Sequence, residues 1–273
     1  MKKIEKFEVP EVLKNIINEI IWLYVDASHD TIYDKFISSC TSGIVFHFQD
    51  TFEIFEKDRK EFLPKMFFTG SFNRYLELKT NGTINSIIFI LKPYGLFRVF
   101  GLDMAKLSKE RYLDAFDTIG TDFYNTLVRE ENTKEKVDLI CMKLIALLKG
   151  NKNQTEITDD VCDQILKSHG VVKIETLIKQ YKINERYLRR KFIKRIGLPA
   201  KQFAMTARIL YLLENLPILS SPEWIALVND FGYTDQSHLI KDFKSVIGET
   251  PEKFFNRNHE QCRLITFLSI ELL

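Results

Sequence analysis

The stretch from Lys173 to Gly197 decides the architecture of the C-terminal part of the chain; it reads KIETLIKQYKINERYLRRKFIKRIG. Apolar side chains at positions 174, 177, 178 and 181 have the i, i+3, i+4, i+7 spacing of a short amphipathic helix. Lys182 and Ile183 follow as a tight turn, and Asn184 is a favourable N-cap for a second helix. The stretch therefore predicts a helix, a turn and a second helix.

The second of these helices is predicted to have one apolar and one basic face. Its apolar residues recur every four positions and should pack on the first helix: Leu188, Phe192 and Ile196. The opposite face carries three basic residues, with a fourth on its flank: Arg186, Arg190 and Lys194, and Arg189. The arrangement is typical of a helix-turn-helix unit, whose second helix enters the major groove of DNA. Arginine can bond bidentately to guanine, and both Lys and Arg neutralise phosphates.

A second unit of the same design is predicted over residues 220–247. Ser220 and Glu223 have capping-box spacing, and a short apolar stripe follows: Trp224, Ile225 and Val228. The segment 231–233 is the expected turn, in which Gly232 can take positive φ, and Thr234 or Asp235 can cap the next helix. In that helix the expected buried residues are Leu239, Phe243 and Ile247. The expected outward residues are Gln236 in the first turn, then Ser237, His238 and Lys241.

Residues 199–216 between the two units are predicted to form one long helix, with Phe203, Leu210 and Leu213 among its apolar positions. Such a connector should fix the distance between the units. If both second helices enter the same face of DNA, they should lie about one helical turn, ~34 Å, apart.

Ordered motifs extend this pattern beyond a generic helix-turn-helix: L188-x-x-x-F192, GLPAKQF (197–203), Arg208, IA (225–226), FGYTDQSHL (231–239), FK (243–244) and GETP (248–251). With these motifs, residues 155–257 resemble the DNA-binding domain of the AraC/XylS family of bacterial transcription regulators. The sequence departs from the family at Ile178 and Lys182, where Ala and Gly are common.

The resemblance implies which residues contact bases: Arg186, Arg189 and Arg190 in the first unit, and Gln236, Ser237 and Lys241 in the second. Three further residues are candidate DNA contacts: Lys194, His238 and Lys244. For His238, contact with the DNA backbone and packing within the protein are both open. The family also implies contact with RNA polymerase and activation more often than repression.

Residues 36–96 predict a small antiparallel sheet or barrel. Short runs rich in Phe, Ile, Val and Tyr alternate with Gly, Pro and Asn-Gly turns: 44–48, 51–55, 75–78 and 86–91. The type of residues 10–25 is ambiguous, because helical periodicity is mixed with β-branched and aromatic residues. After Gly101 the pattern becomes helical and includes Tyr112, Leu113 and Phe116, then 123–128 and 137–148.

The polar segment 149–155 is the best linker candidate. We therefore expect an α+β N-terminal domain over residues 1–150, then an all-α double helix-turn-helix domain over 155–258, with units at 173–197 and 220–247. An apolar tail follows at 259–273, which is either an association surface or packs back onto a domain.

The N-terminal domain also resembles an uncharacterised domain attached to some regulators of this family. The resemblance rests on Pro10, WLY (22–24), FTG (68–70) and IFILKP-x-G (88–95) followed by a helix. It implies sensing or dimerisation and names no ligand.

Net charge alone would not suggest a nucleic-acid partner, because it is only +2. Its distribution is more informative, since residues 151–258 carry 17 Lys and Arg against 13 Asp and Glu, whereas residues 1–150 carry 21 against 22. No secretory signal or span of about 18 apolar residues is present, so a cytoplasmic protein without a membrane partner is expected.

The four cysteines form no C-x-x-C pair and the five histidines have no paired ligand spacing, so neither a metal nor any other cofactor is expected. An enzyme fused to the DNA-binding domain is the rival class. It is disfavoured because no nucleophile, P-loop or dinucleotide-binding motif is found.

A third hypothesis is a small-molecule effector bound in the N-terminal domain, in an apolar pocket lined by Phe46, Phe48, Phe89 and Phe97. Core packing explains these aromatic residues at least as well. The favoured prediction is a sequence-specific regulator of transcription that binds double-stranded DNA and is modulated by its N-terminal domain. A small-molecule effector and a homodimer stay open.

Overall fold

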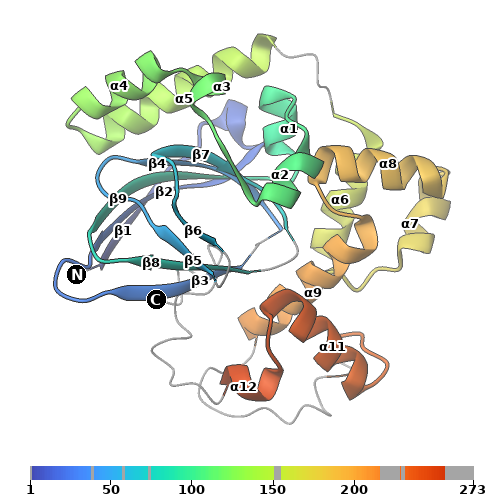
Figure 1. The fold of residues 1–273 in the computed structure, drawn as a ribbon. Coiled ribbons are helices and arrows are strands. Elements are labelled where there is room, and N and C mark those ends of the chain that lie inside the picture. The colour runs from blue at the N-terminus through green and yellow to red at the C-terminus, as the bar shows by residue number, and fades with distance from the viewer. Residues whose placement is uncertain are drawn as a thin grey trace.

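The computed structural model describes residues 2–37, 40–56, 59–72, 75–150, 155–215, 228 and 231–255. Two antiparallel sheets and a group of helices make up the N-terminal half, and the C-terminal half is helical (Figure 1). The predicted fold class, α+β followed by all-α, is thereby confirmed.

The larger sheet has six strands in the order β1-β2-β9-β4-β7-β10, all paired antiparallel. Their bounds are β1 Lys2–Phe7, β2 Ile17–Asp26, β4 Ser42–His47, β7 Met66–Thr69, β9 Thr83–Leu91 and β10 Tyr112–Asp114. A short 3-10 helix, Glu11–Leu13, connects β1 to β2. Because side chains alternate along β4, Ile44 and Phe46 face the N-terminal helices while Val45 faces the second sheet.

The second sheet has four strands in the order β3-β8-β5-β6. Their bounds are β3 Ile32–Ile37, β5 Glu53–Glu56, β6 Arg59–Phe62 and β8 Tyr75–Thr80. An apolar core lies between the two sheets, with Phe67 and Ile88 from the larger sheet meeting Ile54 and Leu76 from the smaller one. The N-terminal domain is therefore a pair of packed sheets, which is more than the single small sheet or barrel expected from sequence.

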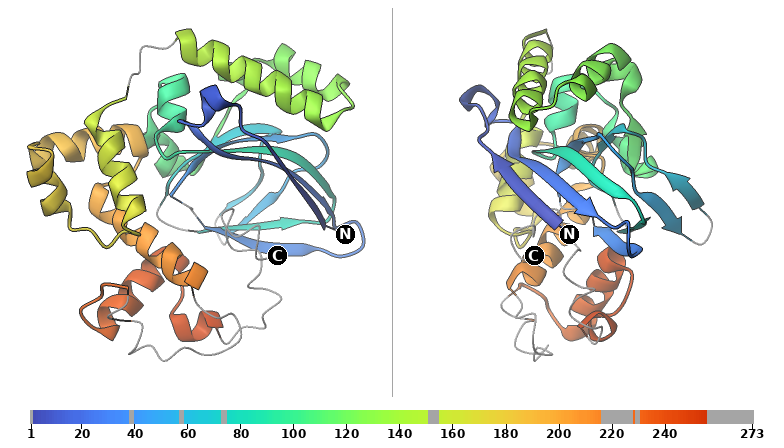
Figure 2. Two further views of the ribbon diagram at one scale, coloured as in Figure 1. Left: turned by 180° about the vertical axis from the view of Figure 1, so that it is seen from behind. Right: turned by 90° about the vertical axis from the view of Figure 1, so that its left-hand side faces the viewer.

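Five helices complete the described part of the N-terminal half: α1 Gly95–Phe100, α2 Met104–Glu110, α3 Phe116–Ile119, α4 Thr121–Arg129 and α5 Thr133–Gly150. Helices α3 to α5 lie along the larger sheet, and α1 and α2 stand between the sheets and the C-terminal helices (Figures 1 and 2). Helices α1 and α2 therefore bring the N-terminal half against the two predicted helix-turn-helix units.

The C-terminal helices share one core. They are α6 Ile157–Lys167, α7 Ile174–Gln180, α8 Glu185–Ile196, α9 Ala200–Asn215, α11 Gln236–Ile247 and α12 Pro251–Phe255. Their core also includes three residues of the N-terminal half: Ile37, Cys40 and Tyr94. The two halves are thus packed against each other.

One local prediction needs correction, and one open assignment is settled. Tyr112 and Leu113 were expected in a helix, but they belong to β10, which pairs with β7 through Leu113 and Phe68. Pairing with a strand more than 40 residues away overrides the local periodicity there. Residues 10–25, whose type was ambiguous, contain the 3-10 helix and then the long strand β2.

Part of the prediction lies outside the described residues. This applies to the start of the second unit at 220–227, including Trp224 and Ile225, to most of the linker, and to the tail at 259–273.

Candidate nucleic-acid interface

The first predicted unit is present as α7, a turn and α8. Ile174 and Leu177 of α7 are buried, as expected for its apolar stripe. Lys182 in the turn has φ of 51°, the left-handed conformation that the family's common Gly adopts without cost. The Asn184 side chain accepts hydrogen bonds from the backbone N–H groups of Arg186, at 2.8 Å, and Tyr187, at 3.3 Å. The predicted N-cap is confirmed.

The two predicted faces of α8 are also present. Leu188, Phe192 and Ile196 are buried in the C-terminal core. The candidate DNA contacts on this helix are all solvent-exposed: Arg186, Arg189, Arg190 and Lys194. The Lys194 ammonium lies 6.0 Å from the centre of the Phe97 ring in α1, so the stripe ends beside the N-terminal half.

A buried ion pair anchors α8 to α6. The Arg195 guanidinium donates from Nε to Asp159 Oδ1 at 2.8 Å and from Nη2 to Oδ2 at 2.6 Å, and both residues are only 1% exposed. Its Nη1 lies 3.4 Å from a Glu156 carboxylate oxygen, and the Phe97 ring covers the guanidinium at 4.5 Å. Burial raises the pKa of the Asp159 carboxyl, and hydrogen bonding from Arg195 opposes that shift.

Sequence analysis missed this pair, although a signal existed. Arg195 follows Leu188 by seven positions and Phe192 by three, which places it on the buried face of α8. The basic residues around Arg195 suggested that its side chain is exposed. Its neighbours Lys191 and Lys194 are at least partly exposed, whereas Arg195 is buried. Arg195 therefore positions the helix and does not belong to the exposed cationic face.

The described part of the second unit follows the same plan. Gly232 in the turn has φ of 69°, and Asp235 caps α11 by accepting a hydrogen bond from His238 N–H at 2.8 Å. This bond lowers the pKa of the Asp235 carboxyl. The expected buried residues are buried: Leu239, Phe243 and Ile247. The candidate DNA contacts are exposed: Gln236, Ser237, His238, Lys241 and Lys244.

His238 already has partners within the protein. Its Nδ1 lies 3.3 Å from Thr234 Oγ1, its Nε2 lies 3.4 Å from an Asp242 carboxylate oxygen, and its ring meets the Tyr233 ring edge-on. Burial raises the pKa of Asp242, against the effect of the nearby His238. Of the exposed candidate residues of α11, His238 has the clearest contacts with other side chains of the protein.

The connector is confirmed as one helix, α9, and it joins the two units through Arg208. The Arg208 Nη2 donates to the Gly170 carbonyl oxygen at 2.7 Å, in the turn before α7. Its Nη1 donates to the Gly232 carbonyl oxygen at 3.3 Å, in the turn before α11. Its guanidinium also lies over the Tyr233 ring at 5.1 Å. One side chain of the connector therefore ties the turn that precedes the first unit to the turn within the second.

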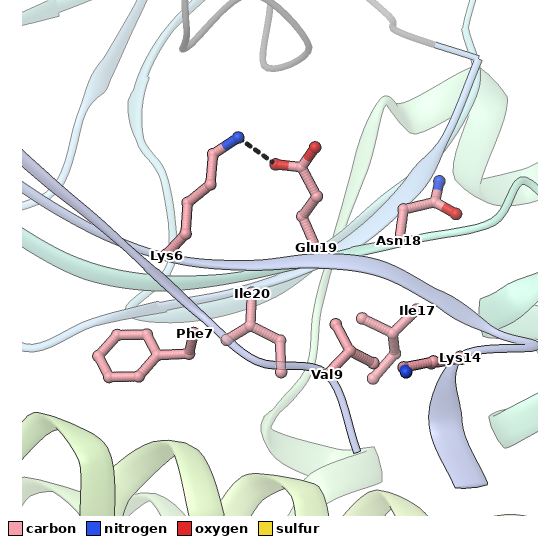
Figure 3. Close-up of a pocket in the computed structure, with 8 residues that line it drawn as sticks. All are labelled: Lys6, Phe7, Val9, Lys14, Ile17, Asn18, Glu19 and Ile20. Atoms are coloured by element: carbon pink, nitrogen blue, oxygen red, sulfur yellow. Dashed lines mark ion pairs between the residues drawn. The ribbon is translucent and has the colours of Figure 1, made fainter. Parts of the chain in front are cut away.

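The N-terminal half has a pocket of about 510 Å³ beside β1 and β2 (Figure 3). It is lined by Lys6, Phe7, Val9, Lys14, Ile17, Asn18, Glu19 and Ile20. Phe7 and Ile20 lie on one side of the strands, and the ion pair between Lys6 and Glu19, at 3.4 Å, lies on the other.

The four aromatic residues considered from sequence as a pocket lining do not line this pocket. Phe46 and Phe89 have no exposed surface and meet edge-to-face in the core, and Phe97 packs beneath Arg195. Phe48 stacks on the Tyr124 ring. Core packing accounts for their positions.

Known protein families match part of each half of the chain. Residues 177–257 match a family described as "Helix-turn-helix domain", in the region where the AraC/XylS motifs lie. The C-terminal region is an AraC-type helix-turn-helix domain. This domain makes the chain a DNA-binding transcription regulator. Residues 6–112 match a family described as "Domain of unknown function (DUF6597)".

Two similar solved structures have low identity to this chain. ToxT from Vibrio cholerae is 12% identical, with 86% of this chain and 97% of ToxT covered and a TM-score of 0.42. The AraC-like transcriptional activator CuxR is 11% identical, with 78% and 86% covered and a TM-score of 0.27. No curated protein matches the chain.

Two kinds of feature are absent from the part of the chain that the structure describes. No helix in that part of the chain is long and apolar enough to cross a membrane. No group of His, Cys, Asp and Glu side chains there could hold a metal ion.

Proposed function

We propose that this chain is a cytoplasmic, sequence-specific regulator that inserts α8 and α11 into neighbouring stretches of the major groove of one DNA duplex. Arg186, Arg189 and Arg190 contact bases in the first stretch, and Gln236, Ser237 and Lys241 contact bases in the second. Lys194, His238 and Lys244 contact the flanking backbone. Residues 1–150 form a regulatory domain and residues 155–258 the DNA-binding domain.

One observation carries this proposal: on both second helices, every candidate contact is exposed, while the residues expected to face inward are buried, namely Leu188, Phe192 and Ile196 in α8 and Leu239, Phe243 and Ile247 in α11. The caps at Asn184 and Asp235 satisfy the first backbone N–H groups of these helices. The first turn of each helix is therefore capped and exposed, as in a recognition helix.

Selection of bound sequences from a random pool of DNA duplexes tests the proposal. Full-length protein should enrich a bipartite motif, because two helices contact two stretches of the groove. An enzyme or a ligand-binding module would enrich no motif.

Substitutions then assign the contacts. Arg190→Ala and Lys241→Ala should each cost about 1–3 kcal/mol of binding free energy and relax the preference at one base position. Glu175→Ala is a matched control, because Glu175 is exposed on α7 and pairs with Lys201 at 2.8 Å, away from the proposed contacts. Binding that is indifferent to Arg186, Arg190 and Lys241 would defeat the assignment.

Activation, dimerisation through the N-terminal domain and contact with RNA polymerase complete the proposal. They rest on the family and not on a described contact. Transcription from a reporter that carries the selected motif distinguishes an activator from a repressor by the sign of the change.

A small-molecule effector in the N-terminal domain is a second candidate, favoured by the pocket beside β1 and β2. Its volume of about 510 Å³ lies within the range of small-molecule sites, and Phe7, Val9 and Ile17 give it an apolar lining. A thermal-shift screen of metabolites against the full chain should give a hit that Val9→Trp abolishes. Hits that survive Val9→Trp would place the effector elsewhere.

A further inference from the structure

The N-terminal half contacts the C-terminal end of both proposed recognition helices. Helix α8 ends at Ile196 with Gly197 as its C-cap, and a Cβ added at Gly197 would lie 2.7 Å from the Met104 carbonyl oxygen and 3.0 Å from Ser108 Cβ, both in α2. Helix α11 ends at Gly248, where an added Cβ would overlap the ring of Tyr75 in β8. At each end, the main chain lies directly against the N-terminal half.

These two contact points are joined to each other. Arg111, the C-cap residue of α2, donates from Nη1 to the Tyr75 carbonyl oxygen at 3.4 Å. The Arg111 carbonyl oxygen accepts a hydrogen bond from Thr69 Oγ1 in β7 at 3.1 Å. Helix α2 and Tyr75 therefore form one support, here called the brace, which consists of Met104, Ser108, Arg111 and Tyr75.

The brace complements the tie made by the connector. Arg208 holds the two units together through Gly170, just before α7, and Gly232, just before α11. The brace holds them at Gly197 and Gly248, where the recognition helices end. A helix-turn-helix unit that is held at one end can pivot about that end, whereas a unit that is held at both ends cannot. The orientation of α11 relative to α8 therefore depends on contacts with both α9 and the N-terminal half.

We propose that the brace sets which spacing between the two DNA elements this protein accepts, with Tyr75 as its positioning residue for α11. The inference rests on the proposed function, since it assumes that α8 and α11 bind one duplex. It assigns to the N-terminal half a role in specificity that needs no base contact from that half.

The spacing of DNA elements is a sensitive readout of this geometry. Inserting one base pair moves the second element by about 3.4 Å and rotates it by about 35°. A rigidly held pair of helices cannot follow this change and loses contacts with one element. A pair held only through α9 can pivot and keep both.

The experiment uses the full chain and the duplex that it selects from the random pool. The gap between the two elements is left unchanged, shortened by one base pair, or lengthened by one or two. Affinity at each gap is measured for the wild type, Tyr75→Ala, Tyr75→Phe and Tyr33→Ala. Tyr33 is a matched control. It pairs with Lys79, which is four positions from Tyr75 on β8, so Tyr33 and Tyr75 lie on the same face of the same sheet, but Tyr33 is 62% exposed.

The wild type should lose about tenfold or more in affinity on a one-base-pair change of the gap. Tyr75→Ala should lose less than about threefold, with its base preferences within each element unchanged. Tyr75→Phe keeps the ring against Gly248 and should behave as the wild type, as should Tyr33→Ala. Gly248→Ala, which acts from the other side of the contact, should relax the gap as Tyr75→Ala does.

The outcomes separate this inference from the proposed function. If the wild type enriches no motif, the proposed function fails. If the wild type binds a bipartite motif but Tyr75→Ala and Gly248→Ala lose as much affinity as the wild type when the gap is changed, the brace proposal alone is overturned. Loss of binding at every gap by both variants, with an unchanged circular dichroism spectrum, also overturns it, because the contact would then serve binding as such.

Discussion

Removing Asp159 should destabilise the C-terminal domain more than any surface substitution in it. In Asp159→Ala the buried Arg195 guanidinium loses both short hydrogen bonds, at 2.6 and 2.8 Å, while its cover by Phe97 remains. Breaking a buried pair from one side costs about 3–5 kcal/mol. We expect the lower end, about 3 kcal/mol, because Glu156 still lies 3.4 Å from Arg195 and offers partial compensation.

Chemical denaturation followed by circular dichroism at 222 nm measures this loss as a lower midpoint of the helical transition. The double variant Asp159→Leu with Arg195→Met should recover most of the stability, because apolar residues of similar volume can replace a buried pair. Glu175→Ala, which breaks the exposed pair with Lys201, should leave the midpoint unchanged. An Asp159→Ala midpoint equal to that of Glu175→Ala would refute the claim that this pair anchors α8.

Three further predictions concern single residues. Asn184→Ala should lower the stability of the C-terminal domain by about 1 kcal/mol in the same denaturation experiment, because the first turn of α8 loses its cap. Lys182→Gly should raise it by up to about 1 kcal/mol, because φ of 51° is strained for Lys; a decrease would show that the turn is not strained. His47 is buried and its pKa is lowered to about 3, so the unfolded chain binds more protons below pH 6.5. Stability should therefore fall as pH drops from about 6.5, by up to about 1.4 kcal/mol per pH unit from this group. The difference between wild type and His47→Leu across pH 7.5 to 5 isolates this effect, and parallel pH curves would contradict it.

The sequence predicted those parts of the interface that are determined locally. Both N-caps, the buried stripes of α8 and α11 and the single connector helix follow from spacings of three and four residues within one helix. The positive φ at Gly232 follows equally from the turn that contains it. In each case the interactions join residues that are close in sequence, so the local spacing of residue types is enough to predict the feature.

The parts that were missed depend on distant residues. Arg195 pairs with Asp159 across 36 positions, and Arg208 bridges two turns that are 62 residues apart. The strand β10 exists because β7 supplies its partner, although the periodicity of Tyr112 and Leu113 suggested a helix. The brace joins α2 and β8 to the ends of α8 and α11, and no single-sequence pattern marks such a contact.

Methylation interference on the selected duplex tests the central claim most directly, because a methyl group on guanine N7 projects into the major groove. Full-length protein should be sensitive to methylation in two clusters whose centres lie about 10 base pairs apart on one face of the duplex. Arg190→Ala should weaken only one cluster and Lys241→Ala only the other. A single cluster that both substitutions weaken equally, or sensitivity confined to the minor groove, would contradict the account.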